Sequence, residues 1–180
     1  MNFRRLSLNA SRYDSGPRHV ATDYFNGDRY LDLVTANSGT DCIGIFIGYG
    51  NGTFASQVTY STGYKSCPYS VVTGNINNDS FVDVVVANYG TNSIGVLFGY
   101  GDGSFTSPVI TSLGSSRPIS LAVGDLNNDN QLDVVVVNHG TSNIALLLGS
   151  NDGSLRIKAF YDMGYDSLPW SLATVDFNHD

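Results

Sequence analysis

Short apolar runs, separated by polar and glycine-rich segments, recur along the chain. Residues 134–137 are four consecutive valines, and such a β-branched run is typical of a strand covered on both faces. We therefore place one strand at 132–137, with a preceding strand at 119–124 and a following strand at 144–148. The Asp-Gly pair at 152–153 predicts a hairpin turn into a fourth strand. These elements predict an all-β fold.

The same four-strand unit recurs with a period of about 50 residues. Residues 75–88 align with 125–138, residues 26–37 align one period upstream, and a proline opens each unit at 17, 68, 118 and 169. We place the units at approximately 17–67, 68–117 and 118–168, with a partial unit at 169–180. Four antiparallel strands in a unit of this length are typical of a β-propeller blade.

The number of units is small for a closed ring, since propellers typically close with roughly four to eight blades. We therefore interpret the chain, with about three and a half blades, as a fragment of a seven-bladed or similar propeller. The alternative is self-association, in which two copies complete one ring.

The loop between the first and second strands of the third unit has the spacing Asp-x-Asn-x-Asp-x-x-x-Asp, and the other units follow this spacing with changes. Positions one, three, five and nine supply side-chain oxygens, and position seven supplies a backbone carbonyl. Ca²⁺ takes six to eight oxygen ligands, whereas Mg²⁺ demands stricter geometry and zinc prefers Cys and His. The spacing predicts calcium sites, although Asp and Asn are also common in ordinary polar turns.

The candidate ligands differ between the units. The third unit offers the most carboxylates, and the second has Asn at position one and Phe at position seven. In the first, Tyr24 occupies position one, so that either a bulge lets Asp23 reach the ion or the site is impaired. The fourth, with Asp176, Asn178 and Asp180, lacks the ninth-position acid and is expected to be empty. The candidate metal ligands are Asp125, Asn127, Asp129, Gln131, Asp133, Asn75, Asn77, Asp79, Phe81, Asp83, Asp23, Asn26, Asp28, Tyr30 and Asp32.

Composition narrows the function classes. Nine Lys and Arg against sixteen acids give a net charge of −7, which argues against nucleic-acid binding. No apolar run reaches the roughly 20 residues that span a bilayer, and no signal peptide is visible at the start. The two cysteines allow one bridge, Cys42–Cys67, which the sequence leaves open.

Aromatic residues gather in the loops opposite the expected calcium rim, at Tyr13, Tyr64, Tyr89 and Tyr165, with His139 nearby. Such residues suit ligand recognition, but they also fill contacts between blades, and both interpretations stay open. The histidines fall at unrelated places in the unit, and no nucleophile-elbow pattern is present. The sequence therefore predicts no enzyme.

These units resemble the FG-GAP or VCBS-type repeats of integrin-α-like β-propellers. The resemblance covers almost the whole chain, and the Asp-x-Asn-x-Asp-x-x-x-Asp loop carries it. It implies Ca²⁺ at the bottom rim and an extracellular or cell-surface location. The stretch at 96–103 departs from the integrin pattern, which argues against integrin-like pairing.

The sequence and this resemblance together predict a calcium-binding, non-catalytic module for adhesion. Its partner would be a protein or glycan, bound through the loops opposite the calcium rim. The alternatives are the propeller domain of a polysaccharide lyase or hydrolase, and a lectin.

Overall fold

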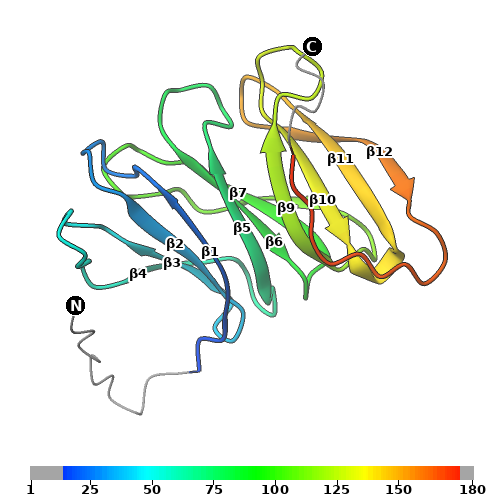
Figure 1. Ribbon diagram of the computed structural model, residues 1–180, viewed down its shortest axis with the longest axis horizontal. Helices are drawn as coiled ribbons and strands as arrows, with labels where there is room; N and C mark the ends of the chain where they lie inside the picture. Colours follow the sequence, from blue (N-terminus) through cyan, green and yellow to red (C-terminus); the bar gives the residue numbers. More distant parts are fainter. Residues whose placement is uncertain (1–13, 175–180) are drawn as a thin grey trace.

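The computed structural model describes residues 14–174, which form three four-stranded antiparallel sheets (Figure 1). The first sheet contains β1 (Pro17–Asp23), β2 (Asp32–Asn37), β3 (Cys42–Phe46) and β4 (Val58–Ser61). The second contains β5 (Pro68–Gly74), β6 (Asp83–Asn88), β7 (Ser93–Leu97) and β8 (Val109–Ser112). The third contains β9 (Pro118–Gly124), β10 (Asp133–Asn138), β11 (Asn143–Gly149) and β12 (Leu155–Asp162).

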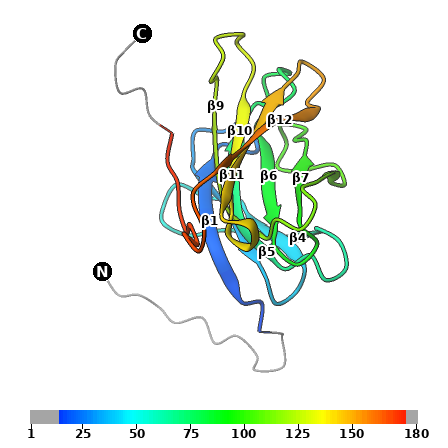
Figure 2. The ribbon, with the colours of Figure 1, turned by 90° about the vertical axis from the view of Figure 1, so that its right-hand side faces the viewer.

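The sheets follow one another like the blades of a propeller. Within each sheet the strands pair in sequence order, because short loops join antiparallel neighbours. The first strands, β1, β5 and β9, lie side by side from sheet to sheet, and Figures 1 and 2 show the sheets fanning out from them. The prediction of an all-β fold with four-stranded propeller blades is confirmed.

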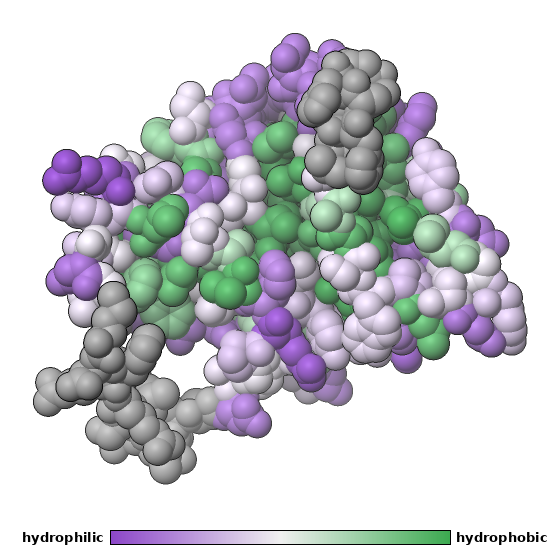
Figure 3. All heavy atoms as spheres, viewed as in Figure 1, coloured by the Kyte–Doolittle hydropathy of each residue, from purple (hydrophilic) through white to green (hydrophobic). Residues whose placement is uncertain are grey.

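The core lies between the sheets, and β6 shows how it is built. Val84 and Val86 pack into the cluster shared with the first sheet, whereas Val85 and Ala87 pack into the cluster shared with the third. All four side chains are fully buried, as the two-face coverage of this strand requires. Apolar atoms also gather over β5, β9 and β10 in Figure 3.

The loops between first and second strands lie along one rim, which is at the top of Figure 1 and which we call the lower rim. This rim links neighbouring sheets. The backbone N–H of Gly103, in the turn after β7, donates to the carbonyl oxygen of Phe25 in the preceding sheet at 2.8 Å. Likewise Asn78 Nδ2 donates to Asn151 Oδ1 at 3.3 Å. The loops of the first two sheets therefore each support the hairpin turn of the next sheet.

Two sequence-based questions are answered by the fold. Cys42 and Cys67 are both free thiols, so the possible disulfide is not formed, and Cys42 is buried beside Thr40 and Asn37. No helix within residues 14–174 is long and apolar enough to cross a bilayer.

Candidate metal site

Three loops at the lower rim carry the predicted ligands, and we call them loop 1 (residues 24–31), loop 2 (75–82) and loop 3 (125–132). Each joins the first strand of its sheet to the second. In loops 2 and 3 the fourth and sixth residues have left-handed backbone, as at Asn128 (φ 58) and Asn130 (φ 63). Asn adopts this conformation more easily than most residues because its side chain bonds locally. The alternating turns draw the side chains at odd positions inward.

In loop 3 three predicted ligands converge. Asp125 Oδ1 and Asn127 Oδ1 both accept a bond from the backbone N–H of Asp129, at 3.2 and 3.0 Å. Asn127 Nδ2 in turn donates to Asp129 Oδ2 at 2.9 Å. Asp129 Oδ1 accepts from the N–H of Gln131 at 2.9 Å, which holds position seven beside the cluster. The side chains at positions one and three thus converge on the backbone amide of position five, and position three also bonds the carboxylate of position five.

Loop 2 repeats this arrangement with one carboxylate fewer. Asn75 Oδ1 and Asn77 Oδ1 accept from the N–H of Asp79 at 3.0 and 3.2 Å, and Asn77 Nδ2 donates to Asp79 Oδ2 at 2.8 Å. Phe81 donates its N–H to Asp79 Oδ1 at 2.8 Å, and its exposed ring offers no ligand atom. The backbone carbonyl is therefore the contribution that Phe81 can make.

Loop 1 keeps only part of the pattern. Asn26 Nδ2 donates to Asp28 Oδ2 at 2.8 Å, and the N–H of Tyr30 donates to Asp28 Oδ1 at 2.6 Å. The structure does not bring Asp23 into this cluster, because Asp23 pairs with Asp32 in the regular β1–β2 ladder and its carboxylate accepts from the N–H of Tyr24. The bulge of β1 lies at the other end of the strand. Position one is therefore Tyr24.

The aspartates at position nine have a role that the sequence did not reveal. Asp32, Asp83 and Asp133 are fully buried. One oxygen of each accepts the N–H at loop position two, and the other accepts the N–H of the glycine following or ending the third strand. These pairs are Phe25 and Gly48, Ile76 and Gly99, and Leu126 and Gly149, at 2.7–3.0 Å. Each carboxylate thus ties its loop to the third strand.

The recurring glycines were the signal for this role. A Cβ on Gly48, Gly99 or Gly149 would lie 2.2 Å from the carbonyl oxygen of the residue before the buried aspartate. Only glycine allows this approach of two backbones. In each unit this glycine follows the buried aspartate by 16 residues. A glycine repeated at this sequence separation could therefore have indicated the hydrogen-bonded aspartate–glycine pair.

The electrostatics of Asp83 reflect its burial. Burial raises the pKa of the Asp83 carboxyl, and the negative charge of Asp79 adds to that effect, while the N–H groups of Gly99, Ile76 and Asn77 oppose it. Asp102 and Asp152, in the exposed hairpin turns, have a lowered pKa because Ser104 and Ser154 donate hydrogen bonds to them. Desolvation is the largest effect at the buried carboxylate, whereas hydrogen bonds outweigh it at the turn carboxylates.

The donor set of loops 2 and 3 fits a hard cation. Among residues 14–174 no three His, Cys, Asp or Glu side chains lie close enough together to hold an ion by themselves. A site in these loops therefore needs amide and carbonyl oxygens in addition to carboxylates, which is the mixture that Ca²⁺ accepts and zinc does not. The fourth predicted loop, at 176–180, lies outside the described residues.

Three β-sheets arranged as blades, each with a loop that carries Asp and Asn at the same rim, define β-propeller blades built from sequence repeats. The FG-GAP-like repeat family matches residues 24–86, 75–136 and 125–180. The chain belongs to this family. Among curated proteins, no relative matches the sequence.

Solved structures share the fold at low identity. A streptogramin B lyase matches with a TM-score of 0.63 and 19% identity, over 91% of this chain and 46% of that chain. Selenomethionine-substituted virginiamycin B lyase from Staphylococcus aureus matches with a TM-score of 0.61 and 17% identity, over 91% and 47%. A catalytically inactive variant of virginiamycin B lyase from Staphylococcus aureus, with quinupristin, matches with a TM-score of 0.60 and 17% identity, over 92% of this chain and 47% of that chain. The chain spans about half the length of these proteins, and the likeness shows the fold alone.

Proposed function

We propose that this chain is a calcium-stabilised, non-catalytic β-propeller module that recognises a protein or glycan outside the cell or at its surface. The observation that carries the proposal is the convergence of Asp125, Asn127 and Asp129 in loop 3. A loop that offers two carboxylates and an amide oxygen at alternate positions, with left-handed turns between them, is suited to Ca²⁺.

The residues that would hold the ion are the side chains at positions one, three and five and the carbonyl of Gln131. Calcium would supply charge neutralisation and would fix the turn between the first and second strands. Asp133 already accepts two backbone N–H groups, so its first contribution is to hold the loop in place. Loop 3 should bind more tightly than loop 2, because ligand charge tunes calcium affinity.

A binding role is supported by the surroundings of the titratable groups. Asp83, whose pKa is raised by burial, is enclosed by backbone N–H groups and has no exposed surface. It therefore cannot act as a general acid on a substrate, which needs hydrogen-bond reach to the reacting atom. The upper rim instead presents aromatic and cationic side chains, which favour recognition.

Thermal melting with and without calcium tests the proposal. At a calcium concentration a hundred times the dissociation constant, stability should rise by about 2.7 kcal/mol, because the ion binds only the folded loop. For a chain of this size the melting temperature should rise by about 5–10 °C over chelator. Asp129→Ala should lose most of this shift and keep a smaller one from loop 2.

The matched control is Asp152→Ala. Asp152 also accepts the N–H of the residue two positions ahead, Ser154 at 3.0 Å, as Asp129 does with Gln131, but it lies in a hairpin turn. Its calcium shift should equal that of the unmodified chain. Equal shifts in the Asp129→Ala and Asp152→Ala variants, or no shift in the unmodified chain, would refute calcium stabilisation.

A further inference from the structure

The repeats differ from one another at two positions of the upper rim, opposite loops 1 to 3. One is the second residue of each first strand, where a β-bulge interrupts the ladder: Arg18, Tyr69 and Ile119. The other follows each second strand: Ser38, Tyr89 and His139. A bulge re-aims the side chain of the extra residue. The bulge is the same in all three sheets, whereas the residue that it re-aims differs.

In the structure three of these residues, Arg18, Tyr69 and Tyr89, form a continuous stack with Arg117 across the sheets. The guanidinium carbon of Arg18 lies 4.8 Å from the centre of the Tyr69 ring. Tyr69 and Tyr89 are stacked, with ring centres 4.8 Å apart and planes inclined by 30°. Arg117 lies over Tyr89 at 5.7 Å. We call Arg18, Tyr69, Tyr89 and Arg117 the upper-rim stack.

Arg117 is held in position before any ligand arrives. Its N–H donates to Asn92 Oδ1 at 2.9 Å, and its carbonyl oxygen accepts the N–H of His139 at 3.2 Å. Its aliphatic stem fills the space over Gly140, where an added Cβ would lie 3.0 Å from Arg117 Cβ, Cγ and Cδ. Such pre-organisation reduces the entropy cost of binding.

The charge of the stack contrasts with that of the protein. The chain carries a net charge of −7, and loops 1 to 3 place four of its sixteen acidic side chains, Asp28, Asp79, Asp125 and Asp129, at the opposite rim. Within residues 14–174, Arg18 and Arg117 are both exposed and each guanidinium is held by a tyrosine ring. A guanidinium has five N–H donors, and it can pair two of them with a carboxylate bidentately.

Exposed aromatic rings flank the stack. Tyr64 is 83% exposed, with Lys65 Nζ 5.2 Å from its ring centre. At the other end Trp170 is 67% exposed. Its ring centre lies 4.8 Å from that of His139, and the two rings are in an edge-to-face arrangement. Free ring faces beside cations suit the apolar faces of sugar rings that also carry negative charge.

We propose that the upper-rim stack binds an acidic glycan, with the carboxylates of its uronic acid units paired to Arg18 and Arg117. This inference rests on the proposed recognition function and names its ligand class. The exposed rings favour a polysaccharide over an acidic peptide, because they match repeated rigid sugar rings.

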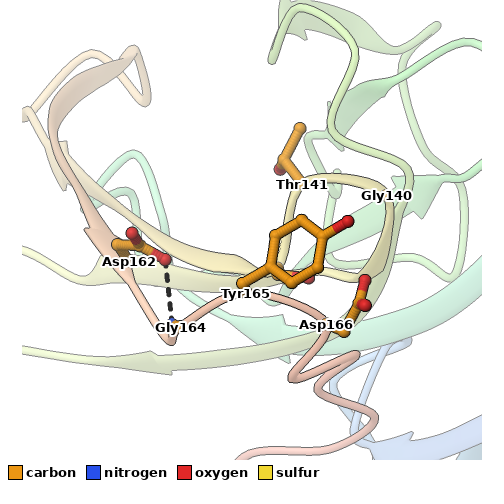
Figure 4. Close-up of a pocket in the computed structure, with 7 residues that line it drawn as sticks. Gly140, Thr141, Asp162, Gly164, Tyr165 and Asp166 are labelled. Atoms are coloured by element: carbon orange, nitrogen blue, oxygen red, sulfur yellow. Dashed lines mark hydrogen bonds between the residues drawn. The ribbon is translucent and has the colours of Figure 1, made fainter.

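A nearby hollow limits where an anionic ligand can lie. It encloses about 380 Å³ beside the segment after β10 and is lined by Thr141, Asp162, Tyr165 and Asp166, among others. Figure 4 shows the two carboxylates on either side of the Tyr165 ring. Because like charges repel, an acidic glycan should avoid this hollow and lie along the upper-rim stack.

Calorimetric titration of the full chain with tetragalacturonate tests the proposal, and its methyl ester serves as the uncharged counterpart. The acid should bind at least about tenfold more tightly than the ester, and its affinity should fall between about 0.01 M and about 0.15 M salt. Arg18→Gln combined with Arg117→Gln should weaken binding about tenfold or more. Arg156→Gln, on the outermost strand β12, should leave it unchanged.

Four outcomes would overturn the assignment. These are no binding of tetragalacturonate, equal affinity for its ester, the same loss in the Arg156→Gln control, and equally tight competing binding of poly-L-glutamate, which would indicate an acidic peptide. The melting experiment is independent. A calcium shift without uronate binding would retain the calcium-stabilised module and reject this ligand, and the reverse result would reject calcium stabilisation alone.

Discussion

Replacing Asp83 with alanine should lower the free energy of unfolding by about 3–5 kcal/mol, even in the presence of a calcium chelator. The carboxylate accepts the N–H groups of Ile76, Asn77 and Gly99 at 2.8, 3.3 and 2.9 Å. Alanine would leave these buried donors unpaired. The burial that raises the Asp83 pKa also means that removing the charge recovers some free energy, but three unpaired donors outweigh that gain.

Urea unfolding in chelator measures this effect, and Asp102→Ala is the control. Asp102 is exposed and accepts the N–H of Ser104 in its own turn at 2.9 Å, so its variant should unfold at nearly the same urea concentration as the unmodified chain. The urea midpoint of Asp83→Asn should lie between those of the two alanine variants. Its amide oxygen can still accept a hydrogen bond, but its amide N–H would face a second backbone donor. Equal midpoints for the two alanine variants would contradict the structural role of Asp83.

Gly99→Ala should be the other severe change, costing about 3 kcal/mol or more. The added methyl would lie 2.2 Å from the carbonyl oxygen of Val82, which is backbone and cannot swing away. Relief requires the backbone at position 99 to move away from Val82, and that movement would break the hydrogen bond from the position-99 N–H to Asp83. The variant should therefore lose both the close packing of position 99 against Val82 and this hydrogen bond.

Gly124→Ala is the matched control for this prediction, measured by the same urea unfolding. Gly124 also sits beside a loop of the lower rim, at the end of β9, but the nearest atoms to an added Cβ are 3.8 and 3.9 Å away. That variant should remain within about 1 kcal/mol of the unmodified chain. A Gly99→Ala midpoint equal to that of Gly124→Ala would show that the close approach does not constrain the fold.

The strands could be predicted closely from sequence. The run predicted at 132–137 is β10, Asp133–Asn138, and the run predicted at 144–148 is β11, Asn143–Gly149. Both are bounded by polar turns that recur in every unit, and the valines of β10 repeat those of β6. Apolar pattern and turn chemistry therefore agree, which is the condition under which local sequence specifies a strand.

The orientation of the aspartates could not be predicted in the same way. Spacing places Asp133 in the predicted ligand set, but it cannot show that both oxygens already accept backbone N–H groups, one of them from Gly149. It also cannot decide whether Asp23 reaches loop 1, because that depends on the ladder register, which pairs Asp23 with Asp32. These properties arise from contacts between strands.

The contacts of the upper-rim stack could be predicted even less from the sequence. Tyr64, Tyr89 and Tyr165 all belong to the predicted aromatic set, but only the structure separates Tyr89, which stacks on Tyr69, from Tyr165, which is 97% exposed. The contact of Arg18 with Tyr69 crosses between sheets and depends on two β-bulges. Bulges leave no distinct signature in this composition, so the partners could not be matched.

Diffraction from crystals grown with calcium, at a wavelength where calcium scatters anomalously, tests the central claim most directly. The account predicts an anomalous peak in loop 3, with oxygens of Asp125, Asn127 and Asp129 at about 2.3–2.6 Å from it. A map with no peak there at saturating calcium, with Asn127 Nδ2 still bonded to Asp129 as in the present structure, would contradict the account.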